Sequence, residues 1–123
     1  MKQIKYRSNF SDNRGEIFDL IEKENINAVT MISFFKDSIR GNHFHKKTTQ
    51  WNFVLNGELL VISKKKGIKK KKLFKKNDLF ILEPNEQHAI KALKKSLLLV
   101  FTKGPRGGKE YENDTFRLKR KLI

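Results

Sequence analysis

The sequence predicts an all-β domain, either a barrel or a sandwich, and three observations support this fold class. Short runs rich in β-branched and aromatic residues recur along the chain, clusters of turn residues separate them, and amphipathic-helix periodicity is hard to find. A length of 123 residues is typical of one domain with one hydrophobic core. We therefore expect a single domain over residues 1–123, with its core at about 28–103 and a polar C-terminal tail at 104–123.

Eight segments have the composition of strands, and residues typical of turns and loops lie between them. The segments are Ile4–Arg7, Glu16–Ile21, Ala28–Phe35, Gln50–Leu55, Leu59–Lys64, Leu79–Leu82, Gln87–Leu93 and Leu97–Thr102. Loops are predicted at 36–42 and 103–108. The Asn56-Gly57 pair stands between two apolar runs, which predicts a tight two-residue hairpin turn.

The composition excludes several classes of site. The chain has no cysteine, so disulfides, thiolate metal sites and thiol nucleophiles are ruled out. The first residues lack the apolar stretch of a signal peptide. No apolar run approaches the roughly 20 residues that a membrane-spanning helix needs. We therefore predict a cytoplasmic protein with no membrane partner.

The charge is strongly positive, with 28 basic and 13 acidic residues and a net charge of +15. Such a field attracts polyanions of any kind. Nine of the thirteen residues from Lys64 to Lys76 are lysine, which we interpret as a solvated hairpin tip. Only six of the basic residues are arginine, and no aromatic residues alternate with lysine as they do in strands that stack bases. A nucleic-acid partner is therefore a minor alternative.

The three histidines of the chain lie in two segments. His43 and His45 are two residues apart, so both side chains point the same way if the segment is extended. Gln50 and Asn52 share one face of the next predicted strand, where polar residues are costly unless they line a cavity. His88 has an inward direction on a later strand. This pattern predicts a metal-binding or proton-transferring site inside the barrel, and histidines that only hydrogen-bond in a polar lining remain the alternative.

The region from Arg40 to Ala89 resembles the cupin superfamily. One motif reads Gly41-Asn42-His43-Phe44-His45, then Gln50 and Gly57, and a second runs from Asn77 through Pro84 to His88. The resemblance implies a jelly-roll barrel, the double-stranded β-helix, with four metal positions at His43, His45, Gln50 and His88. Gln50 stands where the family usually has glutamate, and this neutral side chain should weaken metal binding. The cofactor prediction leaves two alternatives open: one divalent metal (zinc, nickel, iron or manganese), or none.

A narrower resemblance lies in the Arg40-Gly-x-His43 segment, which is similar to the sugar-nucleotide branch of the cupins. This branch includes dTDP-4-dehydrorhamnose 3,5-epimerases, dTDP-sugar 3,4-ketoisomerases and cupin domains of capsular polysaccharide proteins. The resemblance implies that His43 removes a proton beside a keto group and that Arg40 holds the sugar or its pyrophosphate. Tyr111 is the candidate acid. Gln50, Asn52 and Lys46 complete the predicted substrate-binding set.

The sequence thus predicts an isomerase of a nucleotide sugar in surface-polysaccharide synthesis, acting as a homodimer on a small-molecule substrate. Two alternatives stay open. One is a metal-dependent oxygenase or lyase that acts on a small acid. The other is a cupin without enzymatic activity that binds a carbohydrate or another ligand.

Overall fold

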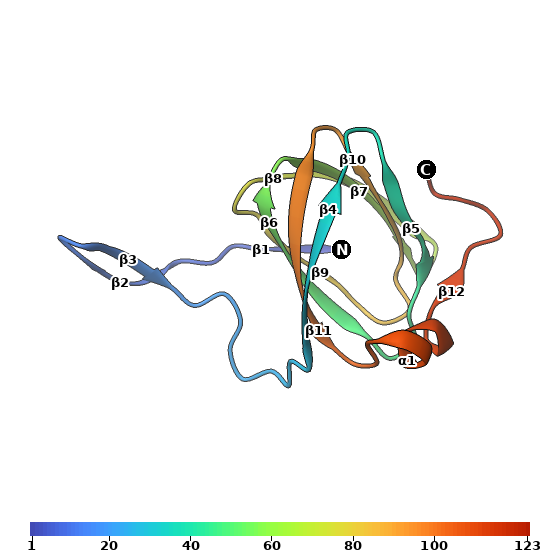
Figure 1. Ribbon diagram of the computed structural model, residues 1–123, viewed down its shortest axis with the longest axis horizontal. Helices are drawn as coiled ribbons and strands as arrows, with labels where there is room; N and C mark the ends of the chain where they lie inside the picture. Colours follow the sequence, from blue (N-terminus) through green and yellow to red (C-terminus); the bar gives the residue numbers. More distant parts are fainter.

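The computed structural model describes residues 1–123 and consists almost entirely of β-strands (Figure 1). The strands are β1 (Lys2–Ile4), β2 (Ser8–Asp12), β3 (Gly15–Phe18), β4 (Ala28–Phe34), β5 (Ile39–Phe44), β6 (Thr49–Asn56), β7 (Glu58–Lys65), β8 (Ile68–Lys75), β9 (Leu79–Leu82), β10 (Gln87–Ala92), β11 (Ser96–Lys103) and β12 (Phe116–Arg117). One short helix, α1 (Gly108–Asn113), precedes the last strand. No helix has the length and apolar character that crossing a membrane requires.

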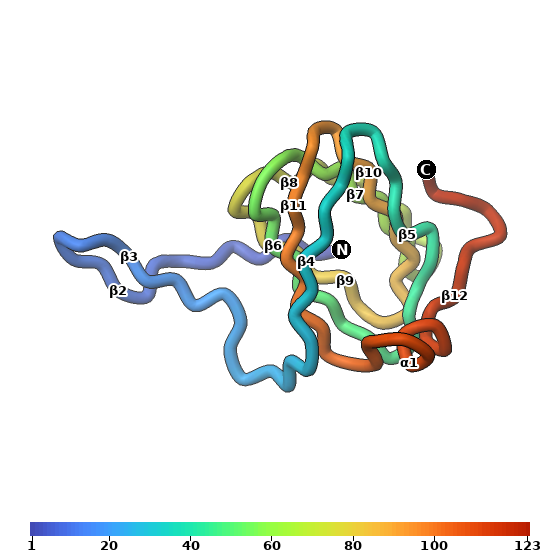
Figure 2. Tube along the Cα trace, viewed as in Figure 1, coloured from blue at the N-terminus to red at the C-terminus, as the bar shows by residue number.

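Two five-stranded antiparallel sheets form the barrel. The strand order is β1-β9-β6-β11-β4 in one sheet and β12-β5-β10-β7-β8 in the other. From β4 to β11 the chain passes back and forth between the sheets, and only β7 and β8 are consecutive neighbours in one sheet. This alternation is the double-stranded β-helix, so the predicted all-β jelly-roll barrel is confirmed. The trace in Figure 2 shows the two sheets curving around one interior.

The hydrophobic core lies between the two sheets. Along β11 the buried residues alternate with half-buried ones, as expected for a strand with one face on the core. Phe74 and Phe80 come from opposite sheets and stack with ring centroids 4.2 Å apart. Eleven buried residues form this core: Phe34, Val54, Leu59, Val61, Phe74, Phe80, Leu82, Ile90, Ala92, Leu98 and Val100.

The hairpin of β2 and β3 projects away from the barrel as an arm (Figure 1). The strands at the start of the chain differ from the prediction of a strand at Ile4–Arg7. The first strand of the chain ends at Ile4 and the second begins only at Ser8. Phe10, Ile17 and Phe18 are all exposed on this arm.

Four strands lie outside the predicted segments: β2, β5, β8 and β12. The predicted loop at 36–42 is wrong over its second half, because β5 begins at Ile39. The lysine run is not only a hairpin tip, because residues 68–75 form the whole of β8 along the edge of its sheet. Lysine is a poor strand former, but edge strands tolerate it and it discourages pairing with other chains.

The predicted hairpin at Asn56-Gly57 is also wrong. β6 and β7 belong to different sheets and do not pair, so Gly57 carries the chain from one sheet to the other. Gly57 has φ +94°, whereas a primed two-residue turn requires positive φ at Asn56 as well, and Asn56 does not have it. A Cβ atom at Gly57 would overlap the Ser96 side chain and lie 2.7 Å from the Lys95 carbonyl oxygen. Glycine is needed for the sheet crossing itself.

We expect Gly57→Ala to destabilise the protein by about 3 kcal/mol, since the change combines a left-handed backbone with a clash in a packed region. Gly67→Ala is the matched control. Gly67 also has positive φ, but nothing lies within 4 Å of its added Cβ, so only about 1 kcal/mol should be lost. Urea denaturation measures both. Equal losses of stability in the two variants would mean that the clash with Ser96 does not contribute to the destabilisation.

Candidate active site

A cavity of ≈ 570 Å³ opens into the barrel, and half of its sixteen lining residues are hydrophobic. The lining comes from β4, β5, β6, β10 and β11, together with the segment that contains α1. Cavities of this size, mostly apolar with a few converging polar groups, are typical of small-molecule sites. The polar lining residues are Ser33, Arg40, His43, Gln50, Asn52, His88, Arg106 and Tyr111.

A β-bulge places His43 in this cavity. His43 lies opposite His88 and Gly41 lies opposite Ala89, so Asn42 is an extra residue without a partner on β10. Both Gly41 and Asn42 have positive φ, at 94° and 57°. A Cβ at Gly41 would lie only 2.8 Å from the His88 carbonyl oxygen, so this close approach needs glycine. Bulges are common beside active sites because they redirect a side chain.

The three histidines form one cluster. One ring nitrogen from each of His43, His45 and His88 lies within 4.8 Å of the others. The His45 Nδ1 donates to the Asp114 carbonyl oxygen at 2.9 Å, and the His88 Nδ1 donates to the Glu86 carbonyl oxygen at 3.0 Å. A carbonyl only accepts, so both neutral rings carry their proton on Nδ1 and leave Nε2 free as an acceptor. The Nε2 of His45 is buried and has no hydrogen-bond partner.

Burial lowers the pKa of all three imidazoles. Desolvation is the largest cause in each ring, and it lowers the pKa of His43 to about 4, with the neighbouring His45 as the next cause. The pKa of His88 is well below its usual range because the ring is fully enclosed and faces the two other histidines. The pKa of His45 is also lowered, although Asp114 partly opposes the shift. The cluster is therefore neutral at pH 7 and able to accept a proton or a metal.

The lowered pKa values predict that the metal-free protein loses stability as the pH falls from 6.5 towards 4. Above pH 6.5 the histidines are neutral in both the folded and the unfolded protein. Below pH 6.5 the unfolded chain binds protons, whereas the folded cluster stays neutral. His43 alone accounts for up to about 3 kcal/mol of this loss. Chemical denaturation at pH 6 and pH 5 tests this. His43→Asn should lose less stability between these values, and an unchanged pH dependence would contradict the lowered pKa of His43.

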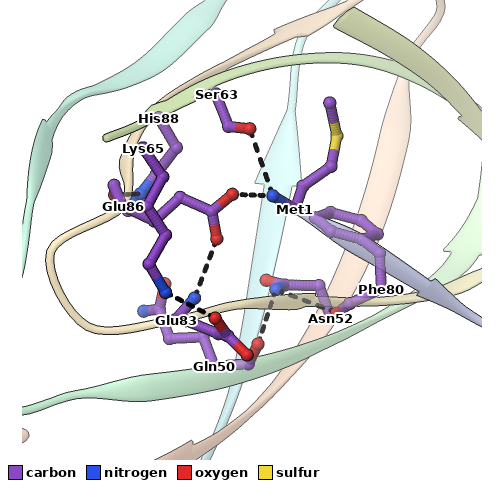
Figure 3. A network of polar contacts seen from close by, with 9 residues as sticks. All are labelled: Met1, Gln50, Asn52, Ser63, Lys65, Phe80, Glu83, Glu86 and His88. Carbon is purple, nitrogen blue, oxygen red and sulfur yellow. Dashed lines mark hydrogen bonds and ion pairs between the residues drawn. The ribbon is translucent and has the colours of Figure 1, made fainter. Parts of the chain in front are cut away.

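The donor set fits a divalent transition metal. Three neutral imidazoles are suitable ligands for zinc, nickel or iron, and Gln50 lines the same cavity with a neutral amide. No carboxylate joins the three histidines in this cluster. The buried carboxylate of Glu86 instead pairs with the Met1 amino group and accepts a hydrogen bond from the Glu83 backbone N–H at 3.0 Å (Figure 3).

Asp114 connects the C-terminal segment to the histidine motif. Its side chain is 5% exposed and accepts hydrogen bonds from the backbone N–H groups of Lys46 and Lys47 and from the Thr48 hydroxyl, at 2.9–3.1 Å. Its carbonyl oxygen accepts the His45 bond described above. Asp114 therefore fixes both the loop after β5 and the orientation of the His45 ring. No sequence signal separated Asp114 from the other acidic residues of the tail.

The structure brings most of the predicted site residues together. Arg40, Gln50, Asn52 and Tyr111 line the cavity with His43 and His88. His45 lies behind this lining, with its ring centroid 4.8 Å from that of His43 and 5.4 Å from that of Tyr111.

Two residues differ from the sequence-based expectation. Lys46, a predicted substrate-binding residue, is not brought to the cavity, because its ammonium lies 4.4 Å from the ring centroid of Phe116 and outside the cavity lining. Arg106 was not predicted but lines the cavity, with its guanidinium 4.5 Å from the Tyr111 ring centroid. Arg106 belongs to the glycine-rich 103–108 segment that the sequence analysis assigned to a plain loop.

Comparison with known proteins agrees with this geometry. The family model described as cupin matches residues 19–122. The chain belongs to the cupin family. A search of curated protein sequences finds no match.

Among solved structures, this cupin is similar to sugar-nucleotide enzymes. A double mutant of the 3,4-ketoisomerase QdtA from Thermoanaerobacterium thermosaccharolyticum, in complex with TDP, is 25% identical with a TM-score of 0.73, and the match covers 94% of this chain and 85% of that one. The TDP-quinovose 3,4-ketoisomerase WlaRB from Campylobacter jejuni is 20% identical with a TM-score of 0.79, covering 94% and 91%. The dTDP-4-dehydrorhamnose 3,5-epimerase from Sulfolobus tokodaii is 16% identical with a TM-score of 0.66, covering 94% and 81%.

Proposed function

We propose that this cupin is an epimerase or keto-isomerase of a nucleotide sugar, and that it acts in the synthesis of a surface polysaccharide. The observation that carries the proposal is a neutral imidazole, His43, in a cavity that also presents Arg40 and Tyr111. The similarity to a TDP-bound ketoisomerase at 25% identity supports the same substrate class. We also propose the cytoplasmic location that the sequence predicts.

In this proposal His43 takes the proton from the carbon beside the keto group. The C–H bond breaks, the imidazole gains the proton, and the carbonyl becomes an enolate whose oxygen needs nearby donors. Tyr111 lines the same cavity, and its hydroxyl supplies or receives the second proton in this proposal. Return of a proton to the opposite face of the same carbon inverts it. Delivery to the former carbonyl carbon, with loss of the neighbouring hydroxyl proton, moves the keto group instead.

The cations at the cavity suit a diphosphate. Arg40 and Arg106 both line it, and the net charge of +15 draws an anionic substrate towards the protein. A bound diphosphate would also raise the pKa of His43 from about 4 towards neutrality, because a nearby negative charge favours the protonated ring. Substrate binding would thereby make His43 a stronger base.

The test is incubation with TDP-4-keto-6-deoxyglucose, the ligand in one QdtA complex, in deuterated water. Proton NMR should show deuterium entering the sugar at a carbon beside the keto group, and the position identifies an epimerase or a ketoisomerase. The absence of exchange, with TDP binding retained, would favour a binding protein without this activity.

The histidine cluster supports a second candidate, a metal-dependent cupin enzyme. His43, His45 and His88 would hold the metal with Gln50, and the metal would supply Lewis-acid chemistry at a substrate oxygen. In that case His43 is a ligand and not a base. Elemental analysis of protein purified without an affinity tag decides between the two roles. Near-stoichiometric metal that a His45→Ala/His88→Ala variant loses would support the metal centre, and its absence would leave His43 free.

We also propose the homodimer that the sequence analysis predicts, and exposed apolar residues support it. The β2–β3 arm exposes Phe10 and Ile17, and the edge strand β4 exposes Val29 and Met31. Met31 also lines the cavity, so a partner on β4 would help to enclose the site. Light scattering should give twice the mass of 14.5 kDa, and Val29→Lys should yield a monomer. A wild-type monomer would contradict the dimer without affecting the proposed reaction.

A further inference from the structure

The hairpin formed by β7 and β8 carries nearly half of the net charge of the molecule. Its turn at Lys66-Gly67 has positive φ at both residues, as in a two-residue primed turn. We define the basic hairpin as residues 64–72, which contain seven lysines. Only Lys65 has an acidic partner, Glu83 at 2.6 Å, and the other six lysines form no ion pair.

The arrangement of the lysines lowers the stability of the fold. Lys64 lies directly opposite Lys69 in the pairing of β7 with β8, and like charges in opposite positions destabilise a sheet. Acidic residues at alternate positions would relieve this repulsion, but the hairpin has none. A repulsive arrangement of this kind is relieved when an external anion binds.

The C-terminal segment extends the basic hairpin into a groove of ≈ 410 Å³. Five cations line the groove and no acidic residue does: Lys64, Lys69, Lys119, Arg120 and Lys121. Asn42 holds the C-terminal segment in place, because its side-chain oxygen accepts from the Leu122 backbone N–H at 2.8 Å and its backbone oxygen from Leu118 at 2.9 Å. None of the groove residues lines the active-site cavity.

An apolar residue also lies beside the turn of the basic hairpin, on the strand face opposite to that of Lys69. Ile68 directly follows the turn and is 64% exposed. Its neighbours Lys66 and Lys69 are exposed as well. An isolated exposed isoleucine is unremarkable, but one beside the turn of a lysine-rich hairpin can enter the boundary between headgroups and acyl chains while the lysines remain with the headgroups.

We propose that the basic hairpin and the adjoining C-terminal cations bind the anionic surface of a lipid bilayer. Clusters of four to eight basic residues near a membrane attract acidic lipids, with each lysine contributing about fivefold to the affinity. The sequence predicts no membrane partner because no segment can span a bilayer, but surface binding does not require such a segment. This proposal is independent of the proposed enzymatic function.

Other polyanions fit these residues less well. Protein interfaces are enriched in aromatic residues and arginine and depleted in lysine, whereas this surface is almost entirely lysine. Binding of single-stranded nucleic acid uses exposed aromatic side chains for stacking, and the one aromatic residue of β8, Phe74, is fully buried. Mobile lipid headgroups need only a field of point charges and an adjacent apolar residue.

The test is co-sedimentation of the full chain with vesicles of phosphatidylcholine containing 30 mol% phosphatidylglycerol, or of phosphatidylcholine alone, over a series of salt concentrations. We expect binding only to the anionic vesicles, weakening as salt rises. Lys64→Gln/Lys69→Gln/Lys71→Gln should lower the affinity about 100-fold. The control Lys5→Gln/Lys36→Gln/Lys95→Gln removes the same charge from exposed sites elsewhere and should lower it less than tenfold.

Ile68→Ser separates a bilayer from a nucleic acid. It should weaken binding to anionic vesicles while leaving the affinity for a 20-nucleotide DNA strand unchanged, and its thermal midpoint should match the wild type because the residue is exposed. Equal losses of vesicle affinity in the two triple variants would mean that binding depends only on net charge, which would overturn the proposal. Tighter binding to DNA than to anionic vesicles at the same salt, or no vesicle binding at low salt, would also overturn it.

Discussion

His43→Asn should slow deuterium exchange into TDP-4-keto-6-deoxyglucose by about 10²- to 10⁴-fold, the range in which a general base contributes. Asparagine keeps a polar side chain of similar size in the cavity but cannot accept a proton at neutral pH. The bulge at Gly41-Asn42 determines where the side chain at position 43 points, and this backbone geometry does not depend on the imidazole. NMR exchange rates with saturating substrate measure the effect on the chemical step.

Two control measurements show whether the loss of exchange comes from loss of the base. The Kd for TDP, measured by calorimetry, should stay within about threefold, because Arg40 and Arg106 rather than His43 are proposed to hold the diphosphate. Lys46→Gln changes a side chain that lies against Phe116 outside the cavity, so exchange should be unaffected. If His43→Asn retained full exchange, His43 would not be the base. If it lost TDP binding as well, its role would be structural.

The barrel and the histidine cluster were predictable because both depend on local patterns. Strand alternation put Gln50 and Asn52 on one face and His88 on an inward one, and the structure places all three at the cavity. The resemblance of the region from Gly41 to His88 to the cupin motifs implied the jelly-roll topology, which alternation alone leaves open. These features need only spacing along the chain, which a single sequence displays fully.

The features that were missed depend on contacts between distant segments. Asn56-Gly57 has the composition of a hairpin turn, and only the packing of Ser96 against Gly57 shows that the chain changes sheets there. Arg106 lies in a segment with the composition of a loop, and it reaches the cavity only because α1 folds back across the barrel end. Local propensity contains no information about which sheet a strand joins.

Asp114→Ala should destabilise the protein by about 3–4 kcal/mol, because it leaves three donors without their acceptor in a region that is mostly buried. Asp114→Asn keeps one oxygen acceptor and should lose about half as much. Glu110→Ala, in the helix that ends directly before Asp114, is the matched control. Glu110 is exposed and makes no side-chain hydrogen bond or ion pair, so the change should stay within about 0.5 kcal/mol. Urea denaturation at pH 7 compares the three variants.

Asp114→Asn should also affect catalysis. It should do so by displacing other side chains and not by removing a contact with the substrate. Asp114 holds the loop that directly follows His45, and α1 immediately before it carries Tyr111, so a loosened loop displaces both side chains. We expect Asp114→Asn to lower kcat about tenfold and to change the Kd for TDP less, because Arg40 lies within β5 and not in the displaced segments. A purely structural role would instead lower the amount of folded protein and leave kcat per folded molecule unchanged. Measuring kcat against the folded fraction in the same samples therefore distinguishes a positioning residue from a residue that only stabilises the fold.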